Sequence, residues 1–309
     1  MKRRGGNVWH GWLAVDKPAG WSSFQVVARV RHLTGVAKVG HGGTLDPFAE
    51  GLLPLALGEA TKVLGLVLEG DKRYRCRLRF GEETDSGDPT GTVIARSEQR
   101  PEPSAVASAL QGFLGEIEQV PPLFSAIHVE GERAYQLARR GENVVLPART
   151  VRIDRLELLS CTAEEAELLV QCGKGTYIRS LVRDLGRLLG CGATLTRLIR
   201  LQTLGFDLQE AVTLEMVEQA VRENRLPTIL LPMDRVLDDI PVLRLGEEEW
   251  RRLTLGQAVR VETELRTTGV VRLYDPNQRF GAIGEVSPEG AGRVLVRPQR
   301  VFSLGGVPS

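Results

Sequence analysis

In KRYRCRLRF, residues 72–80, arginine alternates strictly with an apolar or aromatic side chain from the second residue onward. Strict alternation puts successive side chains on opposite faces, as along a β-strand. The segment therefore predicts a half-buried strand, and the turn TDSGDPTG with the returning segment TVIAR predicts an antiparallel partner at 92–96. One face carries Arg73, Arg75, Arg77 and Arg79, and the other carries Tyr74, Cys76, Leu78 and Phe80.

The rest of the chain is punctuated by 34 glycines and 16 prolines, and the short apolar segments between them predict many strands and few helices. One helix is predicted to begin after an N-cap at Ser22 or Ser23 and to end at Gly35. Its expected apolar face consists of Phe24, Val27, Val30 and Leu33. Other helices are predicted near 104–113, 133–141 and 177–190, and a strand at 120–129.

The sequence changes character at PMDRVLDDIP, residues 232–241, where two prolines and four charges are typical of a linker. A short helix, EEEWRRL, and four strand-like segments follow it. We therefore predict an α+β chain with a first domain at 1–240 and a small, mostly β second domain at 241–309.

The net charge is only +1 over 309 residues, so contact with nucleic acid would have to be local. The four cysteines include no CxxC pair and the four histidines are scattered, which favours neither a zinc site nor a disulfide framework. The apolar stretch near the N-terminus, 12–15, is too short for a signal peptide or a membrane span. We expect a cytoplasmic protein that contacts no membrane.

Asp46 stands in GHGGTLDPFAEGLL, residues 40–53, and has two interpretations. An aspartate followed by proline is a common start of a helix, with the aspartate as N-cap. The three glycines before it, however, allow unusual backbone angles or close approach to a ligand, which a cap alone does not require. Both a capping and a catalytic role are open from these residues.

Arginines recur every fourth residue in GKGTYIRSLVRDLG and beyond, at positions 179, 183 and 187. Such a stripe is most often a solvated helix face. Arg179 differs because it lies in the predicted first turn, where the helix dipole disfavours a cation. An anionic partner would stabilise it there, and a buried aspartate is one candidate.

Two other basic features are open to alternative interpretations. The arginine face at 73–79 could meet phosphates or simply be a solvated strand face, and Tyr74 opposite it could be an ordinary core residue. A second cluster could contact an RNA backbone or be balanced by nearby glutamates. It comprises Arg133, Arg139, Arg140, Arg149, Arg152 and Arg155, with Tyr135 and His128 close by.

Five segments together resemble, in order and spacing, the TruB family of tRNA pseudouridine-55 synthases, over most of residues 11–205. They are DKPAGWSS (16–23), GHGGTLDPFAEGLLPLALGEATK (40–62), DKRYRCRLRFGEETDSGD (71–88), VPPLFSAIHVEGERAYQLARRG (120–141) and GTYIRSLVRDLG (175–186). LGQAVRV (255–261) and FGAIGEV (280–286) are more loosely similar to the family's PUA-like RNA-binding domain.

The resemblance implies a pseudouridine synthase fold, with a mixed, mainly antiparallel sheet, flanking helices and a central cleft. It implies isomerisation of a uridine in the T loop of tRNA to pseudouridine, with the base flipped out of its stack. No cofactor and no metal is expected, and tRNA, through its T arm, is the expected partner of a monomer that requires no other protein.

The resemblance also assigns residues. Asp46 matches the essential aspartate, which attacks the sugar C1′ or removes the C2′ proton, and the sequence leaves both routes open. Arg179 matches the arginine that pairs with it and keeps it ionised despite burial. Tyr74 matches the tyrosine that stacks on the target base. Expected substrate contacts are His41, Lys17, Tyr177 and Leu198, and expected RNA contacts on an insertion at 123–141 are His128, Arg133, Arg139 and Arg140.

Three departures from the family pattern stand near these motifs. Gly42 replaces a frequent threonine, His128 replaces a lysine, and Ile199 replaces the middle residue of a common Leu-Arg-Arg. None of them alters Asp46, Tyr74 or Arg179, so we predict an active enzyme.

Two alternatives belong to other functional classes. A non-catalytic RNA-binding protein would use the arginine faces and the C-terminal domain, with strongly salt-dependent binding. A glycoside hydrolase would need a second carboxylate about 5–9.5 Å from the first, and Glu50 is the nearest in sequence to Asp46.

Overall fold

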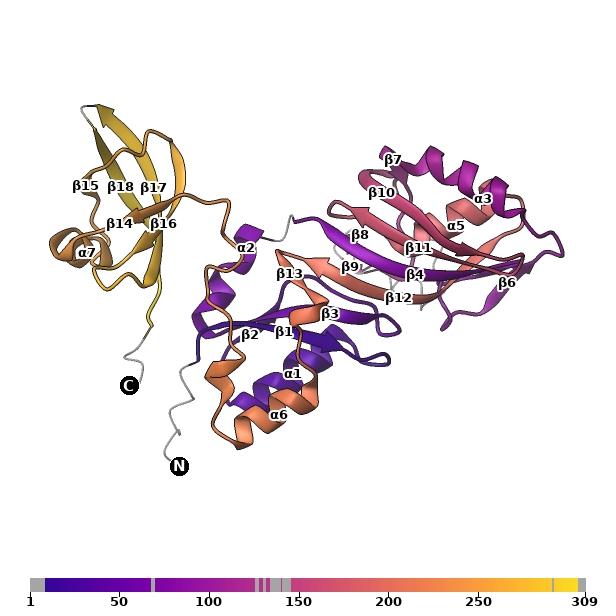
Figure 1. Ribbon diagram of the computed structural model, residues 1–309, viewed down its shortest axis with the longest axis horizontal. Helices are drawn as coiled ribbons and strands as arrows, with labels where there is room; N and C mark the ends of the chain where they lie inside the picture. Colours follow the sequence, from indigo (N-terminus) through magenta and orange to yellow (C-terminus); the bar gives the residue numbers. More distant parts are fainter. Residues whose placement is uncertain are drawn as a thin grey trace.

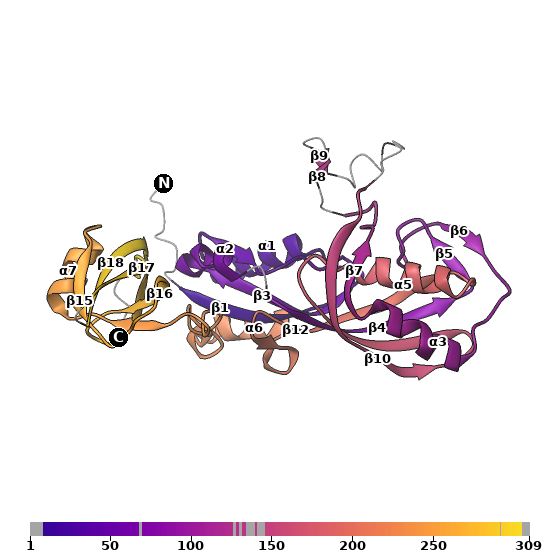
Figure 2. The ribbon, with the colours of Figure 1, turned by 90° about the horizontal axis from the view of Figure 1, so that it is seen from above.

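The computed structural model describes residues 9–67, 70–125, 128–129, 132–133, 140, 146–290 and 292–304, with the backbone alone at 128–129 and 132–133. The molecule is elongated, with a large mixed body and a smaller β unit at one end (Figures 1 and 2). Across these described ranges, no helix combines the length and the apolar character needed to span a membrane.

A nine-stranded sheet forms the body, in the order β1-β3-β12-β4-β11-β10-β7, with β2 paired to β3 and β13 to β12. Within this sheet, as far as the described residues go, β3 and β12 are the one parallel pair, and they join β1 and β3 to the strands from β12 to β7. Gly51 makes this junction possible, because its φ is +95° and a Cβ there would lie 2.5 Å from the carbonyl oxygen of Arg200. The strands are β1 (Gly11–Lys17), β2 (Val39–His41), β3 (Glu50–Leu57), β4 (Lys72–Phe80), β7 (Gly115–Gln119), β10 (Arg149–Cys161), β11 (Glu165–Cys172), β12 (Ala193–Thr203) and β13 (Phe206–Asp207).

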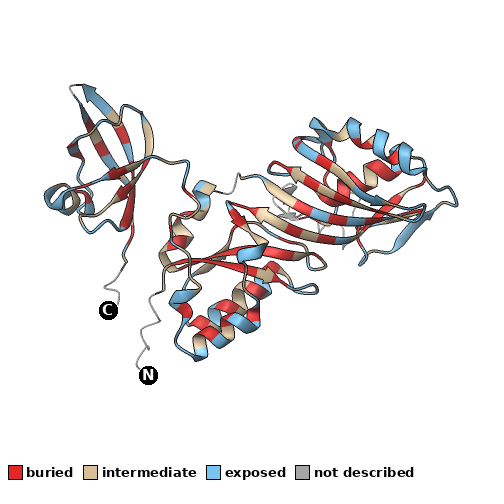
Figure 3. Cartoon of the chain, in the orientation of Figure 1, coloured by how far each residue is buried: buried red, intermediate tan, exposed pale blue. Residues whose placement is uncertain are grey.

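The strand predicted at 72–80 is β4, and its side chains alternate between buried and exposed from Tyr74 onward (Figure 3). Its expected partner was wrong, because β11 and β12 occupy both edges of β4. The returning strand β6 (Val93–Arg96) pairs instead with the short β5 (Glu82–Thr84).

The first helix, α1 (Ser23–Thr34), begins and ends where the sequence predicts. Ser22 and Gln25 form a capping box, and Gly35 ends the helix in the left-handed conformation. The expected apolar face is confirmed only in part. Val30 is buried, and Val27 and Leu33 are partly buried against the core, whereas Phe24 is 73% exposed. The helix also buries Ser23, Val26 and Thr34, which were not expected on this face. The Ser23 hydroxyl bonds the backbone of Leu45, which turns this face toward the loop before Asp46.

The other helices lie around the sheet. The predictions near 104–113 and 177–190 correspond to α3 (Pro103–Leu110) with η2 (Gln111–Phe113) and to α5 (Ile178–Leu188). The strand expected at 120–129 was wrong at 120–125, because the strand of the sheet, β7, ends at Gln119 and no strand follows it there. Residues His128–Val129 form the short strand β8, which pairs with β9 (Glu132–Arg133). Of the helix expected at 133–141, residues 134–139 and 141 lie outside the described residues. The remaining elements are η1 (Gly58–Lys62), α2 (Leu64–Val67), η3 (Leu208–Glu210), α6 (Leu214–Arg222) and η4 (Leu226–Thr228).

A second sheet, in the order β14-β16-β17-β18-β15, has its own buried core. Its first strand, β14 (Val242–Arg244), was not predicted. Phe280 and Phe302 pack against the body in a shared apolar cluster, and Glu59 accepts a hydrogen bond from the backbone of Ser303. The second unit therefore contacts the first through a core. Its elements are β14, α7 (Glu247–Thr254), β15 (Val259–Glu262), β16 (Gly269–Tyr274), β17 (Phe280–Gly290) and β18 (Arg293–Val301).

Candidate active site

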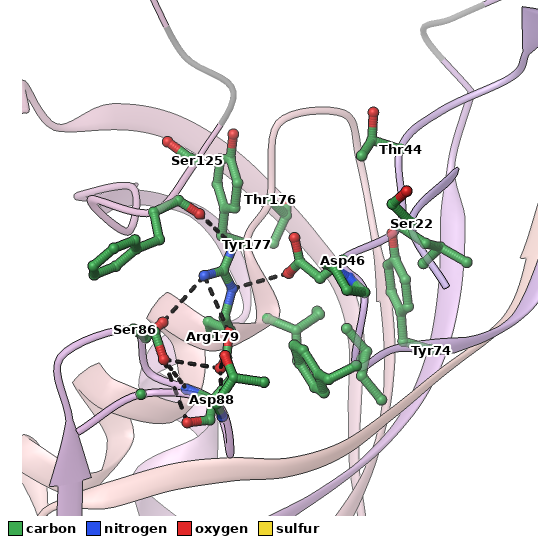
Figure 4. A pocket seen from close by; sticks show the side chains of 18 of the residues that line it. Ser22, Thr44, Asp46, Tyr74, Ser86, Asp88, Ser125, Thr176, Tyr177 and Arg179 are labelled. Atoms are coloured by element: carbon green, nitrogen blue, oxygen red, sulfur yellow. Dashed lines mark hydrogen bonds and ion pairs between the residues drawn. The ribbon is translucent and has the colours of Figure 1, made fainter. Parts of the chain in front are cut away.

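A cavity of about 970 Å³ opens beside β4, between the loop that carries Asp46 and the start of α5. Asp46 lies between Arg179 on one side and Tyr74 on the other (Figure 4). Residues that are distant in sequence, from β4, β12, α5 and the loops at 44–48, 85–92 and 124–125, line this single cavity. The lining includes five of the predicted site residues, which are Asp46, Tyr74, Tyr177, Arg179 and Leu198.

Asp46 is held by a turn, so the helix-cap interpretation was wrong. Residues 44–49 contain no helix, and the amide of Ala49 donates to the carbonyl oxygen of Asp46 at 3.1 Å. Two of the glycines before it are required for different reasons, one for its backbone angle and the other for lack of space. Gly43 has φ +119°, and a Cβ on Gly42 would lie 2.4 Å from a methyl carbon of Leu204.

The same contact gives the departure at Gly42 a physical explanation. Leu204 fills the space that a side chain at position 42 would take, and it has a positive φ of 55° that is uncommon for a leucine. The neighbouring loop is therefore packed at this point, not open.

Arg179 lies in the first turn of α5 and is almost fully buried. Its Nε lies 3.0 Å from Oδ2 of Asp46, as an ion pair whose N–H is not aligned for a hydrogen bond. Nη1 donates to the carbonyl oxygen of Ser86 at 3.1 Å, and Nη2 donates to that of Phe124 at 3.0 Å. These contacts give the cation the anionic partner that its place in the helix requires.

Asp88 is a second carboxylate on Arg179, and the sequence analysis did not single it out. Its Oδ2 lies 3.4 Å from Nη1 of Arg179, and its Oδ1 accepts from Ser86 Oγ at 2.8 Å and Thr90 Oγ1 at 2.6 Å. The residue is buried. The sequence feature that could have indicated it is its place in TDSGD, within one of the matched segments. An aspartate in such a segment is also accounted for by a turn.

The balance of charges leaves Asp46 with a raised pKa. Burial raises the pKa of its carboxyl above the ordinary 3.8; the charge of Arg179 opposes this, and that of Asp88 adds to the rise. The expectation that the cation offsets burial is therefore met only in part. The second carboxylate oxygen of Asp46 points away from Arg179 (Figure 4).

Two tyrosines and a leucine form walls of the cavity. Tyr74 is 7% exposed, and burial raises the pKa of its hydroxyl. Tyr177 immediately precedes α5, and its amide donates to Oε1 of Gln119 at 2.8 Å. Leu198 is buried on β12 beside β4. The ring, the apolar wall and the carboxylate form a compartment that accepts a flat, partly polar group.

Lys17 and His41 do not line the cavity. Lys17 is fully buried, and its Nζ donates to the carbonyl oxygens of Trp21 at 2.6 Å, Pro18 at 3.0 Å and Pro47 at 3.2 Å. Burial lowers its pKa to about 8. His41 lies at the end of β2, and burial, followed by the charge of Arg200, lowers its pKa.

The expected RNA contacts lie largely beyond what the structure describes. Arg139 is outside the described residues, and only the backbone of His128 and Arg133 is described, in β8 and β9. Arg140 is exposed.

Each arginine on the outer face of β4 has a carboxylate neighbour. Arg75 Nη2 lies 2.8 Å from Oε2 of Glu167, and Arg77 lies 4.0 Å from the same carboxylate. Arg73 and Arg79 have carboxylate neighbours at 3.8 and 3.9 Å. This pairing favours the interpretation as a solvated strand face.

The cavity does not bring together the carboxylate pair of Asp46 and Glu50 that a glycoside hydrolase would have used. Glu50 pairs with Arg197 at 2.9 Å and is not part of the cavity lining. Within the described ranges, no three histidine, cysteine, aspartate or glutamate side chains gather as metal ligands would.

Comparison with known proteins identifies the relatives of this chain. Residues 31–178 match the family model described as TruB family pseudouridylate synthase (N terminal domain), and 179–238 match that of the tRNA pseudouridylate synthase B C-terminal domain. Residues 241–302 match Pseudouridine synthase II TruB, C-terminal.

Two curated relatives are similar over nearly the whole chain, and both are named tRNA pseudouridine synthase B. The protein of Nitrobacter winogradskyi is 42% identical over 96% of this chain and 84% of its own. That of Pseudomonas putida strain GB-1 is 42% identical over 97% of this chain and 99% of its own.

Solved structures support the fold. A chain from a structure of an H/ACA RNP bound to a substrate RNA containing 2′-deoxyuridine has a TM-score of 0.72 at 23% identity, over 94% of this chain and 84% of that one. A chain of a Cbf5-Nop10-Gar1 complex has a TM-score of 0.70 at 25% identity, with the same coverage. The predicted pseudouridine synthase fold is thereby confirmed, and the chain belongs to the TruB family of pseudouridylate synthases.

Proposed function

We propose that this pseudouridylate synthase isomerises uridine 55 in the T loop of tRNA, with Asp46 as the essential carboxylate. The observation that carries the proposal is the cavity in which Asp46 stands between a buried cation and a tyrosine ring. The curated relatives at 42% identity bear the name of a tRNA pseudouridine synthase, which supports tRNA as the substrate.

The reaction moves a glycosidic bond within one nucleotide. The bond between N1 and C1′ breaks and its electron pair stays on the uracil, while the Asp46 carboxylate attacks C1′ or removes the C2′ proton. The uracil turns and C5 bonds to C1′, while the bond between Asp46 and C1′ breaks on the first route or the proton returns to C2′ on the second. C5 then loses its proton to water and N1 takes one up. Substrate and product have the same atoms, so the chemistry balances without an added oxidant, reductant or group donor.

The other residues have supporting roles in this proposal. Arg179 orients Asp46 and favours its ionised form, which either route needs. Tyr74 stacks on the flipped uracil, and Leu198 and Tyr177 limit where the ring can lie. Lys17, beneath the loop, holds the carbonyl oxygen of Pro47 and thus the residue next to Asp46.

We also propose the division into a synthase domain at 1–240 and an RNA-binding domain at 241–309, and contact of the insertion at 123–141 with the T arm. The separate sheet and core built from residues 242–301 support the first statement. The order of motifs in the sequence supports the second.

A tritium-release assay tests the proposal. tRNA transcripts carrying tritium at C5 of uridine should release label to water when incubated with the protein, and carbodiimide mapping should locate pseudouridine at position 55. A tRNA with cytidine at that position is the matched substrate control. Asp238→Asn, an exposed aspartate outside the cavity lining, is the matched protein control.

Asp46→Asn should reduce release by at least about 10²–10⁴-fold while tRNA affinity stays close to wild type. Wild-type release by Asp46→Asn would refute the role of the carboxylate. Absence of release by the wild type, with salt-sensitive binding intact, would favour the non-catalytic RNA-binding alternative.

A further inference from the structure

Arg200 is a fully buried cation that the chemistry above does not use. It lies on β12, and its side chain has no solvent-exposed surface. Nε donates to the carbonyl oxygen of Leu52 at 2.8 Å, Nη2 to that of Gly43 at 3.0 Å and Nη1 to that of Thr44 at 3.3 Å. These three acceptors are backbone carbonyls, and the Tyr74 side chain is a further hydrogen-bonding neighbour of the guanidinium. Within the described ranges Arg200 forms no ion pair with a carboxylate.

Such an arrangement needs a reason, because a buried charge is costly unless an opposite charge compensates it. Carbonyl dipoles repay only part of that cost. Arg179 shows the usual solution in the same molecule, since two carboxylates accompany it. The guanidinium of Arg200 has several N–H donors in one plane, and it can therefore bond several carbonyl oxygens at once.

Two of the carbonyls held by Arg200, those of Gly43 and Thr44, lie just before Asp46 in the chain. Lys17, also fully buried, holds the carbonyl oxygen of Pro47 just after it. Two buried cations therefore fix the backbone at both ends of the segment 43–47. The position of the Asp46 carboxylate is determined by this backbone as well as by its contact with Arg179.

Arg200 also lies directly beside Tyr74. The two residues are Cα partners in the register between β12 and β4. The charge of Arg200 opposes the rise that burial causes in the pKa of the Tyr74 hydroxyl, and it lowers the pKa of His41. One guanidinium thus acts on the loop of Asp46, on the strand of Tyr74 and on the end of β2.

We propose that Arg200 is a positioning residue of the isomerisation, which fixes the Asp46 loop relative to the Tyr74 ring without touching the nucleotide. The inference rests on the proposed function, because the target uridine would lie between that carboxylate and that ring. The two groups come from separate segments, and Arg200 contacts the backbone of one and lies in register with the other. A small displacement between them would misplace C1′ relative to the carboxylate.

The test compares Arg200→Met, Arg200→Lys and Arg197→Met. Arg197 is on the same strand, its side chain is 53% exposed, and it pairs with Glu50 away from the cavity, so Arg197→Met is the matched control. Single-turnover isomerisation of tRNA and the tRNA dissociation constant are measured separately for each protein. Thermal unfolding establishes that each variant is folded.

Arg200→Met should lower the single-turnover rate by about 100-fold, as expected for a displacement of roughly 1 Å at the reacting groups, with the dissociation constant within about threefold of wild type. Arg200→Lys should have an intermediate rate, because the charge remains but one ammonium cannot reproduce the fork. Arg197→Met should match wild type in both quantities.

A second readout separates this role from simple loss of stability. NMR titration of labelled His41 should show a higher pKa in Arg200→Met and a value near wild type in Arg200→Lys, because only the first removes the neighbouring charge. If Arg200→Met does not fold, the rate and affinity of Arg200→Lys decide the question.

Wild-type rates in Arg200→Met, or in Arg200→Lys where only that variant folds, would overturn the inference. Equal losses of rate and tRNA affinity would also overturn it, because they indicate a binding role. If wild type and Arg197→Met are themselves inactive on tRNA, the proposed function fails instead, so the two failures are distinguishable.

Discussion

The arginines on the outer face of β4 and those around the cavity have opposite surroundings. On the outer face, Arg75 is half exposed and lies against Glu167, whose charge it largely cancels. At the cavity, Arg179 and Arg200 are withdrawn from water, and their contacts reach the segment around Asp46. The alternating run of arginines in the sequence therefore marks a surface, whereas Arg179 and Arg200, which lie outside that run, mark the site.

The physical reason is solvent. An exposed ion pair is screened by water and salt and contributes little to stability, so either of its residues can be substituted at little cost. A buried guanidinium keeps its full charge and needs fixed partners, so its position organises the groups around it. Variants of each region can strengthen or break this comparison.

Arg179→Met should have the largest effect. It leaves Asp46 and Asp88 near each other without their shared cation, and activity should fall by at least about 10²-fold because the carboxylate is neither oriented nor ionised. The free energy of unfolding should fall by about 2–3 kcal/mol. This loss is smaller than that expected for a fully buried ion pair, because the Asp46 side chain is 32% exposed.

The stability loss in Arg179→Met should depend on pH. Without the cation, whose charge lowers it, the folded-state pKa of Asp46 rises further above its ordinary value, so the folded protein binds more protons than the unfolded chain. Stability then decreases as pH rises, and the variant should be closer to wild type at pH 5 than at pH 8. Chemical denaturation at both pH values measures this; an equal loss at both would contradict the shared-cation arrangement.

Tyr74→Leu should have the next largest effect. Loss of a stacking ring is expected to cost about 1–3 kcal/mol, or roughly 10–100-fold in the rate of isomerisation. Tyr74→Phe keeps the ring and is the matched control, and its rate should exceed that of Tyr74→Leu. Equal rates for the two variants would remove stacking from the proposed mechanism.

Asp88→Asn should move a pH profile. The proposed reaction needs ionised Asp46, so activity should be lost as pH falls through the raised pKa of this carboxyl, above 3.8. Asp88 contributes to that rise, and removing its charge should move the acid limb of kcat/KM to lower pH. Asp238→Asn, an exposed aspartate outside the cavity lining, is the control and should leave the limb in place.

The smallest effect is expected on the outer face. Arg75→Gln should change tRNA affinity by less than about threefold and leave the salt dependence of binding unchanged, because no phosphate contact is lost. Filter binding at several salt concentrations measures both. A shallower salt slope in Arg75→Gln would show that this face does meet the RNA.

The strands and helix ends that depend on residues close together in the sequence could be predicted from the sequence. The alternation at 72–80, the cap at Ser22 and the glycine end at Gly35 all act within a few residues and are found as predicted. Apolar spacing predicted the face that α1 buries only in part, because Ser23 turns inward to bond the Leu45 backbone while Phe24 is exposed. That choice depends on a loop 22 residues away.

For the candidate site, the sequence by itself determined which residues are available, because the matched motifs name Asp46, Tyr74 and Arg179 without any coordinates. Only the tertiary structure decided that Asp46 stands in a turn and not at a helix cap, that Asp88 shares its cation, and that Arg200 is buried beside Tyr74. The second and third of these depend on contacts between residues that are about a hundred positions apart in the sequence. Charge and burial act through space, and so their effects at the cavity are decided by which strands and loops the fold brings together.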